Sequence, residues 1–81
     1  ERITYLMVLD LIVTKTDDGY TAETPSISGC ETWAKDEDEA IEKIKELVAF
    51  YMNLDKPAKI KVDKARRQDE KTVYKLVFNK D

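Results

Sequence analysis

The stretch from Asp18 to Ile44, DGYTAETPSISGCETWAKDEDEAIEKI, decides the fold because it joins two strand patterns, two chain reversals and a helix start. Asp18-Gly19 is typical of a hairpin turn, in which Gly19 is free to take a positive φ. Residues 20–24 alternate as a strand does. Pro25 ends this strand because it has no backbone N–H to offer a neighbouring strand.

Gly29 allows a second tight reversal, and residues 30–35 read as another short strand. Asp36 is placed to cap a helix, with Glu39 three residues later as the partner of a capping-box variant. The apolar residues that follow recur every three or four positions and predict a helix over residues 37–53.

Working outward, residues 3–14 are rich in β-branched and aliphatic side chains and predict a long first strand. The odd positions are apolar and would face the core; they are Tyr5, Met7, Leu9, Leu11 and Val13. The even positions Leu6, Val8 and Ile12 are apolar too, which is typical of a strand covered on both faces. One helix can cover only one face. We therefore expect a homo-oligomer, a dimer or a tetramer, with these three residues at its interface.

Residues 60–64 and 72–78 return to period two and predict two further strands, with a polar turn over residues 65–71. The element order is β-β-β-α-β-β, an α+β fold with one helix packed on a mostly antiparallel sheet. A right-handed crossover through the helix would place the fourth strand beside the first, which predicts the strand order 3-2-1-4-5.

At 81 residues the chain has room for one domain, spanning residues 1–81. A single cysteine excludes an internal disulfide and suggests a reducing compartment, so we expect a cytoplasmic protein. The apolar run over residues 6–13 contains Asp10 and is far shorter than the ~20 residues of a membrane span.

The sequence has no histidine, which removes the Ser-His and Cys-His nucleophile pairs and the commonest general base at neutral pH. Cys30 has no second cysteine as a partner and reads as a packed small residue. Acids crowd the first turn of the predicted helix, where its dipole favours negative charge, and this explains them without a metal.

A nuclease of the ribonuclease H type would need carboxylates that converge on two metal ions. The available candidates are Asp10, Glu42 or Glu46, and Asp63. Asp10 occupies an even strand position, away from the helix, and the two glutamates point away from the apolar stripe of the helix. We therefore expect a non-catalytic protein without metal or cofactor.

Charge is unevenly distributed along the chain. Residues 1–55 carry 13 acidic and 5 basic residues, net −8, and residues 56–81 carry 4 acidic and 9 basic residues, net +5. The basic part is explained either by lysines that protect an edge hairpin from aggregation or by weak contact with nucleic acid.

The ordered motif resembles the HicB-like antitoxin domain, whose pattern is a long first strand, G-[YF]-x-x-x-x-P-x-[LI]-P-G-C, and E-A-[IL] at the start of the helix. The positions that match are Gly19, Tyr20, Pro25, Ile27, Gly29, Cys30, Glu39, Ala40 and Ile41. Ser28 replaces a proline, and Asp36 replaces the usual Thr or Ser at the cap, where Asp serves equally well. The resemblance implies a partial ribonuclease H-like fold.

The resemblance also implies an antitoxin that binds and masks a small basic mRNA-cleaving toxin of the HicA type. Many relatives carry a C-terminal DNA-binding domain, whereas the residues after Lys56 read as strands, so we expect a short form and no direct DNA binding. The acidic residues Asp17, Asp18, Glu23 and Glu31 would complement the cationic toxin. The alternatives are a stand-alone oligomeric domain of unknown ligand and weak nucleic-acid binding through the basic C-terminal hairpin.

Overall fold

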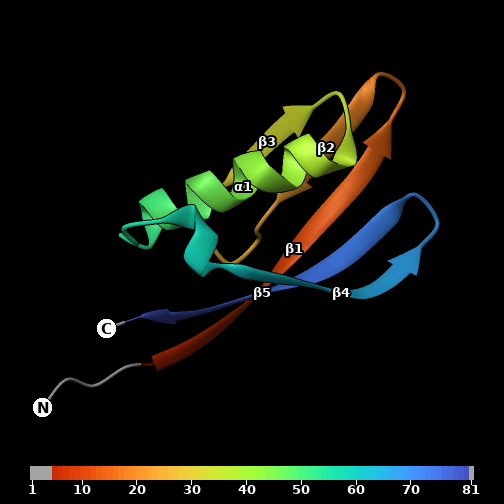
Figure 1. Cartoon of the computed structure of the whole chain (residues 1–81). Helices are drawn as coiled ribbons and strands as arrows, with labels where there is room; N and C mark the ends of the chain where they lie inside the picture. The colour runs from red at the N-terminus through yellow and green to blue at the C-terminus, as the bar shows by residue number, and fades with distance from the viewer. Residues whose placement is uncertain (1–4, 81) are drawn as a thin grey trace, which may run out of the picture.

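The longest strand of the protein forms the middle of a five-stranded sheet, and one α-helix packs on one face of that sheet (Figure 1). This computed structural model describes residues 5–80. The elements are β1 (Tyr5–Thr16), β2 (Gly19–Glu23), β3 (Glu31–Ala34), α1 (Glu37–Tyr51), the 3-10 turn η1 (Pro57–Lys59), β4 (Lys61–Gln68) and β5 (Lys71–Lys80). The predicted α+β class, with one helix on an antiparallel sheet, is confirmed.

The predicted position of the last two strands is wrong. The order is β3-β2-β1-β5-β4, and every neighbouring pair is antiparallel. The last strand, β5, is apolar on both faces and therefore suits the interior of the sheet. Strand β4 is dominated by Lys, Arg and Asp and is stable at an edge, where charged side chains remain in water.

Strand β4 is also longer than predicted and runs through most of the segment that was expected to be a turn. The chain reverses within Asp69 and Glu70, between the paired residues Gln68 and Lys71. Asp69 takes a left-handed φ of 57°, a conformation that Asp tolerates better than most residues. The turn therefore needs neither Gly nor Pro, and it lies within the polar segment 65–71 in which the sequence predicted a turn.

Helix α1 begins as predicted. The side chain of Asp36 accepts a hydrogen bond of 2.8 Å from the backbone N–H of Glu39. The helix ends at Tyr51, two residues earlier than predicted, because Asn53 adopts a left-handed φ of 59°. The Leu54 N–H then donates to the carbonyl of Ala49 at 2.8 Å, and the Asn53 N–H donates to Phe50 at 3.2 Å. This is the Schellman arrangement, with Asn in the place where Gly is usual.

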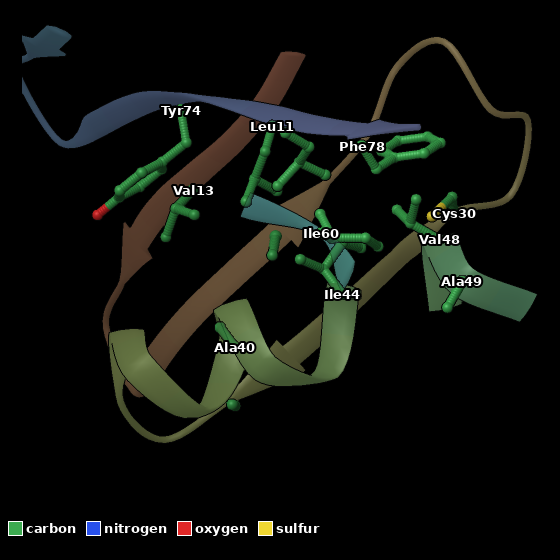
Figure 2. Packing of buried hydrophobic residues seen from close by; sticks show 13 residues of the cluster. Leu11, Val13, Cys30, Ala40, Ile44, Val48, Ala49, Ile60, Tyr74 and Phe78 are labelled. Atoms are coloured by element: carbon green, nitrogen blue, oxygen red, sulfur yellow. The ribbon is translucent and has the colours of Figure 1, made fainter. Parts of the chain in front are cut away.

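The core lies between the helix and the face of the sheet that carries the odd-numbered residues of β1 (Figure 2). Its largest fully buried apolar side chains are Leu11, Ile44, Leu76, Val13 and Val48. The predicted core face of β1 is thus confirmed from Met7 to Val13, whereas Tyr5 is 61% exposed. Strand β1 pairs with β5 over ten residue pairs, and this long ribbon makes the molecule elongated, 49 Å by 21 Å by 21 Å.

The two glycines of the motif serve different purposes. Gly29 has a φ of 80° and closes the reversal before β3, as expected. Gly19 does not take a positive φ, which corrects the expectation for it. A Cβ at Gly19 would lie 2.4 Å from the carbonyl oxygen of Ala34 and 2.8 Å from the Trp33 ring, so glycine is required by close packing across β2 and β3.

Candidate functional site

The four acidic residues proposed to bind a partner fall into two groups in the structure. Asp17 and Asp18 form the turn between β1 and β2, where the hydroxyl of Thr16 donates to Asp18 at 3.1 Å. Glu23 and Glu31 lie at the opposite end of β2, directly across from one another in the β2–β3 register. The structure therefore does not bring all four into one patch.

The turn containing Asp17 and Asp18 lies at the same end of the molecule as the start of α1 and the β4–β5 turn (Figure 1). The pairing of Tyr20 with Ala34 brings the end of β3 beside the start of β2, and α1 begins at Glu37, three residues after Ala34. The backbone N–H of Lys15 donates to the carbonyl of Glu70 at 2.9 Å, which holds the β4–β5 turn beside β1. We call this region the acidic end; its acids are Asp17, Asp18, Asp36, Glu37, Asp38, Glu39, Asp69 and Glu70.

The acidic end is tied to the core by one part-buried hydrogen bond. The hydroxyl of Tyr74 on β5 donates to a carboxylate oxygen of Glu37 at 2.9 Å. Burial of the phenol and this bond to the carboxylate raise the pKa of Tyr74 to about 12. The contact fixes the first turn of α1 against β5, so the acids of the helix start are held on a rigid element.

A second surface is the face of the sheet opposite the helix, which we call the open face. Leu6, Val8 and Ile12 lie on it as predicted: Leu6 is 66% and Val8 52% exposed, and Ile12 is partly exposed. From β5, Val73 and Val77 lie across from Ile12 and Val8. The open face also carries Asp10 and Lys75, which are paired across β1 and β5 and form an ion pair.

Trp33 extends the open face toward β3. It is 41% exposed and packs beside the bare backbone of Gly19. Sequence reasoning did not assign a role to this side chain. The available signal was the period-two alternation of β3, which places Trp33 on the same face as Glu31.

The basic residues of β4 do not form one continuous strip, because successive residues of a strand point to opposite faces. Lys61 and Arg66 pair with Val77 and Val73 and share the open face. Lys64 and Arg67 pair with Tyr74 and Thr72, whose side chains are buried on the helix side. This division favours the interpretation of the lysines and arginines as protection for an edge strand.

The carboxylates considered for a nuclease lie on different sides of the sheet. Asp10 and Asp63 lie on the open face, on either side of Lys75, with which both are paired in register. Glu42 lies on α1, across the sheet, where it accepts a hydrogen bond from Lys45 at 3.2 Å. Among residues 5–80, no group of three or more Asp, Glu and Cys side chains is arranged to hold a metal ion.

Cys30 is buried against the helix, near Val48 in Figure 2. Burial raises the pKa of its thiol, and an interaction with the hydroxyl of Thr24 offsets part of that rise. The Thr24 hydroxyl is itself buried and lacks a hydrogen-bond partner of good geometry. The thiol is therefore mainly protonated at neutral pH and packs as a small apolar group.

Comparison with known proteins gives one informative similarity. The chain is 37% identical over 51 residues to a UPF0150 protein of Archaeoglobus fulgidus, and the aligned part covers 62% of this chain and 74% of that protein. No protein-family model matches the chain, and no solved structure matches it. Within the part of the chain that the structure describes, no helix has the length and hydrophobicity needed to cross a membrane.

Proposed function

Because this chain belongs to the UPF0150 family, and because its ordered loop motif resembles that of HicB-like domains, we propose that it is a non-catalytic antitoxin that binds a small basic mRNA-cleaving toxin of the HicA type. The observation that carries the proposal is the acidic end. It gathers carboxylates from two turns and the first turn of α1, segments that are far apart in sequence.

Charge complementarity is the physical basis of the proposed recognition. An mRNA-cleaving toxin needs a cationic surface to hold the phosphate backbone, and that surface attracts a cluster of carboxylates. Asp17 and Asp18 are exposed at the tip of a hairpin, where a partner can approach them without rearrangement of the sheet. Of the four residues first suggested from the sequence, we keep these two as the toxin contact and assign Glu23 and Glu31 to the open face.

The experiment is an RNA-cleavage assay with any small basic protein that a gene adjacent to that of this chain encodes. Addition of the wild-type chain should abolish cleavage, and association should become slower as salt is raised, because the attraction is electrostatic. The charge-reversed variant Asp17→Lys/Asp18→Lys should need at least about tenfold more protein for the same inhibition, since like charges across an interface repel.

The matched control is Glu23→Lys/Glu31→Lys, which changes the net charge equally but on the open face. It should inhibit as the wild type does. If this variant loses inhibition and the hairpin variant keeps it, the toxin binds the open face and the acidic end is not the contact. If no adjacent gene product binds the wild type, the antitoxin function is wrong.

In that case the second candidate, a stand-alone oligomeric domain of unknown ligand, is preferred. It is supported by the apolar side chains of the open face, which the helix does not cover.

A further inference from the structure

The open face combines exposed apolar side chains with a defined pattern of charge. Leu6 and Val8 are more than half exposed on this face; on β5, Val77 lies across from Val8, and Val73 lies across from Ile12. The Asp10–Lys75 ion pair lies between the Val8–Val77 and Ile12–Val73 pairs, and exposed apolar side chains gathered on one face in this way mark an interaction surface. The two central strands, β1 and β5, therefore form an apolar stripe along the open face.

The charges are arranged across the strands in rows. One row is centred on Ile12 and Val73, which pair across β1 and β5. On one side of this pair lie Glu23 of β2 and Glu31 of β3, and on the other side lies Arg66 of β4. A row here is a set of residues paired across neighbouring strands in the register. The acidic end of this row lies on β2 and β3 and the basic end on β4, so the two ends flank the apolar stripe.

The neighbouring row contains the ion pair. Asp10 of β1 lies opposite Lys75 of β5, and the next row beyond it pairs Val8 with Val77. Within the stripe, negative charge thus lies on β1 and positive charge on β5. In the row of Ile12 the acids lie toward β3 and the base lies on β4, whereas in the row of Asp10 the base Lys75 lies between Asp10 of β1 and Asp63 of β4.

This pattern is self-complementary under one type of two-fold rotation. A two-fold axis parallel to the strands and midway between β1 and β5 places β1 over β5 of the second copy, and β2 over its β4. In that arrangement Asp10 faces the second Lys75, Ile12 faces the second Val73, and Glu23 faces the second Arg66. We propose that the chain forms a homodimer through the open face with this axis, independently of any toxin.

A two-fold axis perpendicular to the strands is disfavoured by the same charges. It would leave each strand stacked over itself, and with the axis at the row of Ile12, Glu23 and Glu31 would face their own copies and Arg66 would face Arg66. Like charges in a shared interface are costly. The charge pattern therefore favours a second copy as the partner, with the two-fold axis parallel to the strands.

The size of the open face is consistent with a stable dimer. Strands rise about 3.3 Å per residue and lie about 4.8 Å apart, which gives the face a projected area of roughly 600 Å². Side chains make the accessible area larger than the projection, and a standard interface buries about 800 Å² on each partner. Sheets that pack face to face with nearly parallel strands form the common aligned sandwich.

The first test measures the association state by sedimentation equilibrium at micromolar concentration. The wild type should be a dimer, and Val8→Asp should be a monomer, because it places a charge in the middle of the apolar stripe. Phe50→Asp is the matched control. Phe50 is 78% exposed on the helix, on the other side of the sheet, and this variant should remain a dimer.

The second test addresses the orientation. Glu23→Arg would face Arg66 of its partner, and Arg66→Glu would face Glu23, so each variant alone should dimerise at least about tenfold more weakly than the wild type. Mixed together, the two variants form a heterodimer in which both cross-contacts again join opposite charges. The mixture should recover the dimer.

A monomeric wild type, or a Val8→Asp variant that remains dimeric while folded by circular dichroism, would overturn the interface. A mixture no more dimeric than either charge variant alone would overturn the axis.

Discussion

Gly19 is the residue at which the backbone and an aromatic ring come closest together. The Trp33 ring and the Ala34 carbonyl occupy the space that a Cβ would need. The ring can shift by rotation, but the carbonyl oxygen belongs to a strand paired with β2 and cannot move without breaking the register. We predict that Gly19→Ala lowers the free energy of unfolding by about 1–3 kcal/mol, the usual range for overpacking.

Urea unfolding followed by circular dichroism measures this effect. Gly29→Ala is the control, because its Cβ would meet only the Tyr51 hydroxyl at 3.6 Å and its cost comes from the left-handed φ, about 1 kcal/mol. A Gly19→Ala variant as stable as the wild type would contradict the need for close packing against the Ala34 carbonyl.

Tyr74 links alkaline pH to stability. Burial and the bond to Glu37 raise the pKa of the folded phenol to about 12, from an ordinary value of 10.0. Between these two values the unfolded chain has released the proton while the folded chain still holds it, so the folded state binds more protons and stability falls as pH rises. The contribution is complete below pH 10.0 and is lost as pH approaches 12.

The variant Tyr74→Phe should remove this dependence. At neutral pH it should be less stable than the wild type by about 1 kcal/mol, the net worth of a hydrogen bond. The difference should shrink as the pH is raised above 10.0. A spectroscopic titration of the tyrosinates should lose its latest step in the variant, and a titration unchanged by the substitution would contradict the assignment.

At the scale of elements, the end of α1 is stabilised by an unusual residue. Asn53 holds the left-handed position that closes the helix, a position in which glycine carries no steric cost. We predict that Asn53→Gly raises the free energy of unfolding by about 0.5 kcal/mol, because relief of the left-handed φ outweighs the greater entropy that glycine loses on folding. Asn53→Ala should lower the free energy of unfolding by about 1 kcal/mol.

Thermal unfolding of both variants checks the sign of each effect. A loss of stability in the glycine variant would show that the Asn side chain itself stabilises the turn.

Features that depend on residues close together in the sequence were predicted correctly. Asp36 marked the helix start, Pro25 and Gly29 bounded the loop, and alternation assigned the two faces of β1 correctly. The order of β4 and β5 was predicted wrongly because the crossover rule was applied to the first strand after the helix. The composition of the two strands carried the answer, since β5 is apolar on both faces and β4 is not.

The candidate site was predicted only in part, for a geometric reason. Asp17 and Glu23 are close in sequence, but β2 carries the chain away from the turn, so the two residues lie at opposite ends of that strand. The acidic end instead combines three segments that are brought together by the helix and two hairpins. No pattern within a single segment indicates such a combination, because it depends on the tertiary arrangement.

At the scale of the whole molecule, the acidic and basic parts of the chain lie on opposite sides of the sheet. The acidic N-terminal part supplies β2, β3 and α1, and the basic C-terminal part supplies β4 and β5. The sheet order places these two parts on opposite sides of β1. A chain with this arrangement offers its acidic end to a cationic partner and its open face to a second copy, so the two proposed contacts do not compete for the same residues.

The strand order itself has a measurable consequence. In the order β3-β2-β1-β5-β4, strand β5 is hydrogen-bonded on both sides, whereas β4 has a neighbour on one side only. An amide proton in a central strand exchanges slowly, because its hydrogen bond breaks only when the central strands separate. An amide proton in an edge strand exchanges faster, through local fraying of that strand. We predict that hydrogen exchange of the amides around Leu76 is at least about tenfold slower than that of the amides around Asp63. The proposed dimer covers the face of the sheet and leaves both edges free, so the difference should persist at concentrations where the dimer forms. Slower exchange in β4 than in β5 would contradict the order and would instead place β4 next to β1.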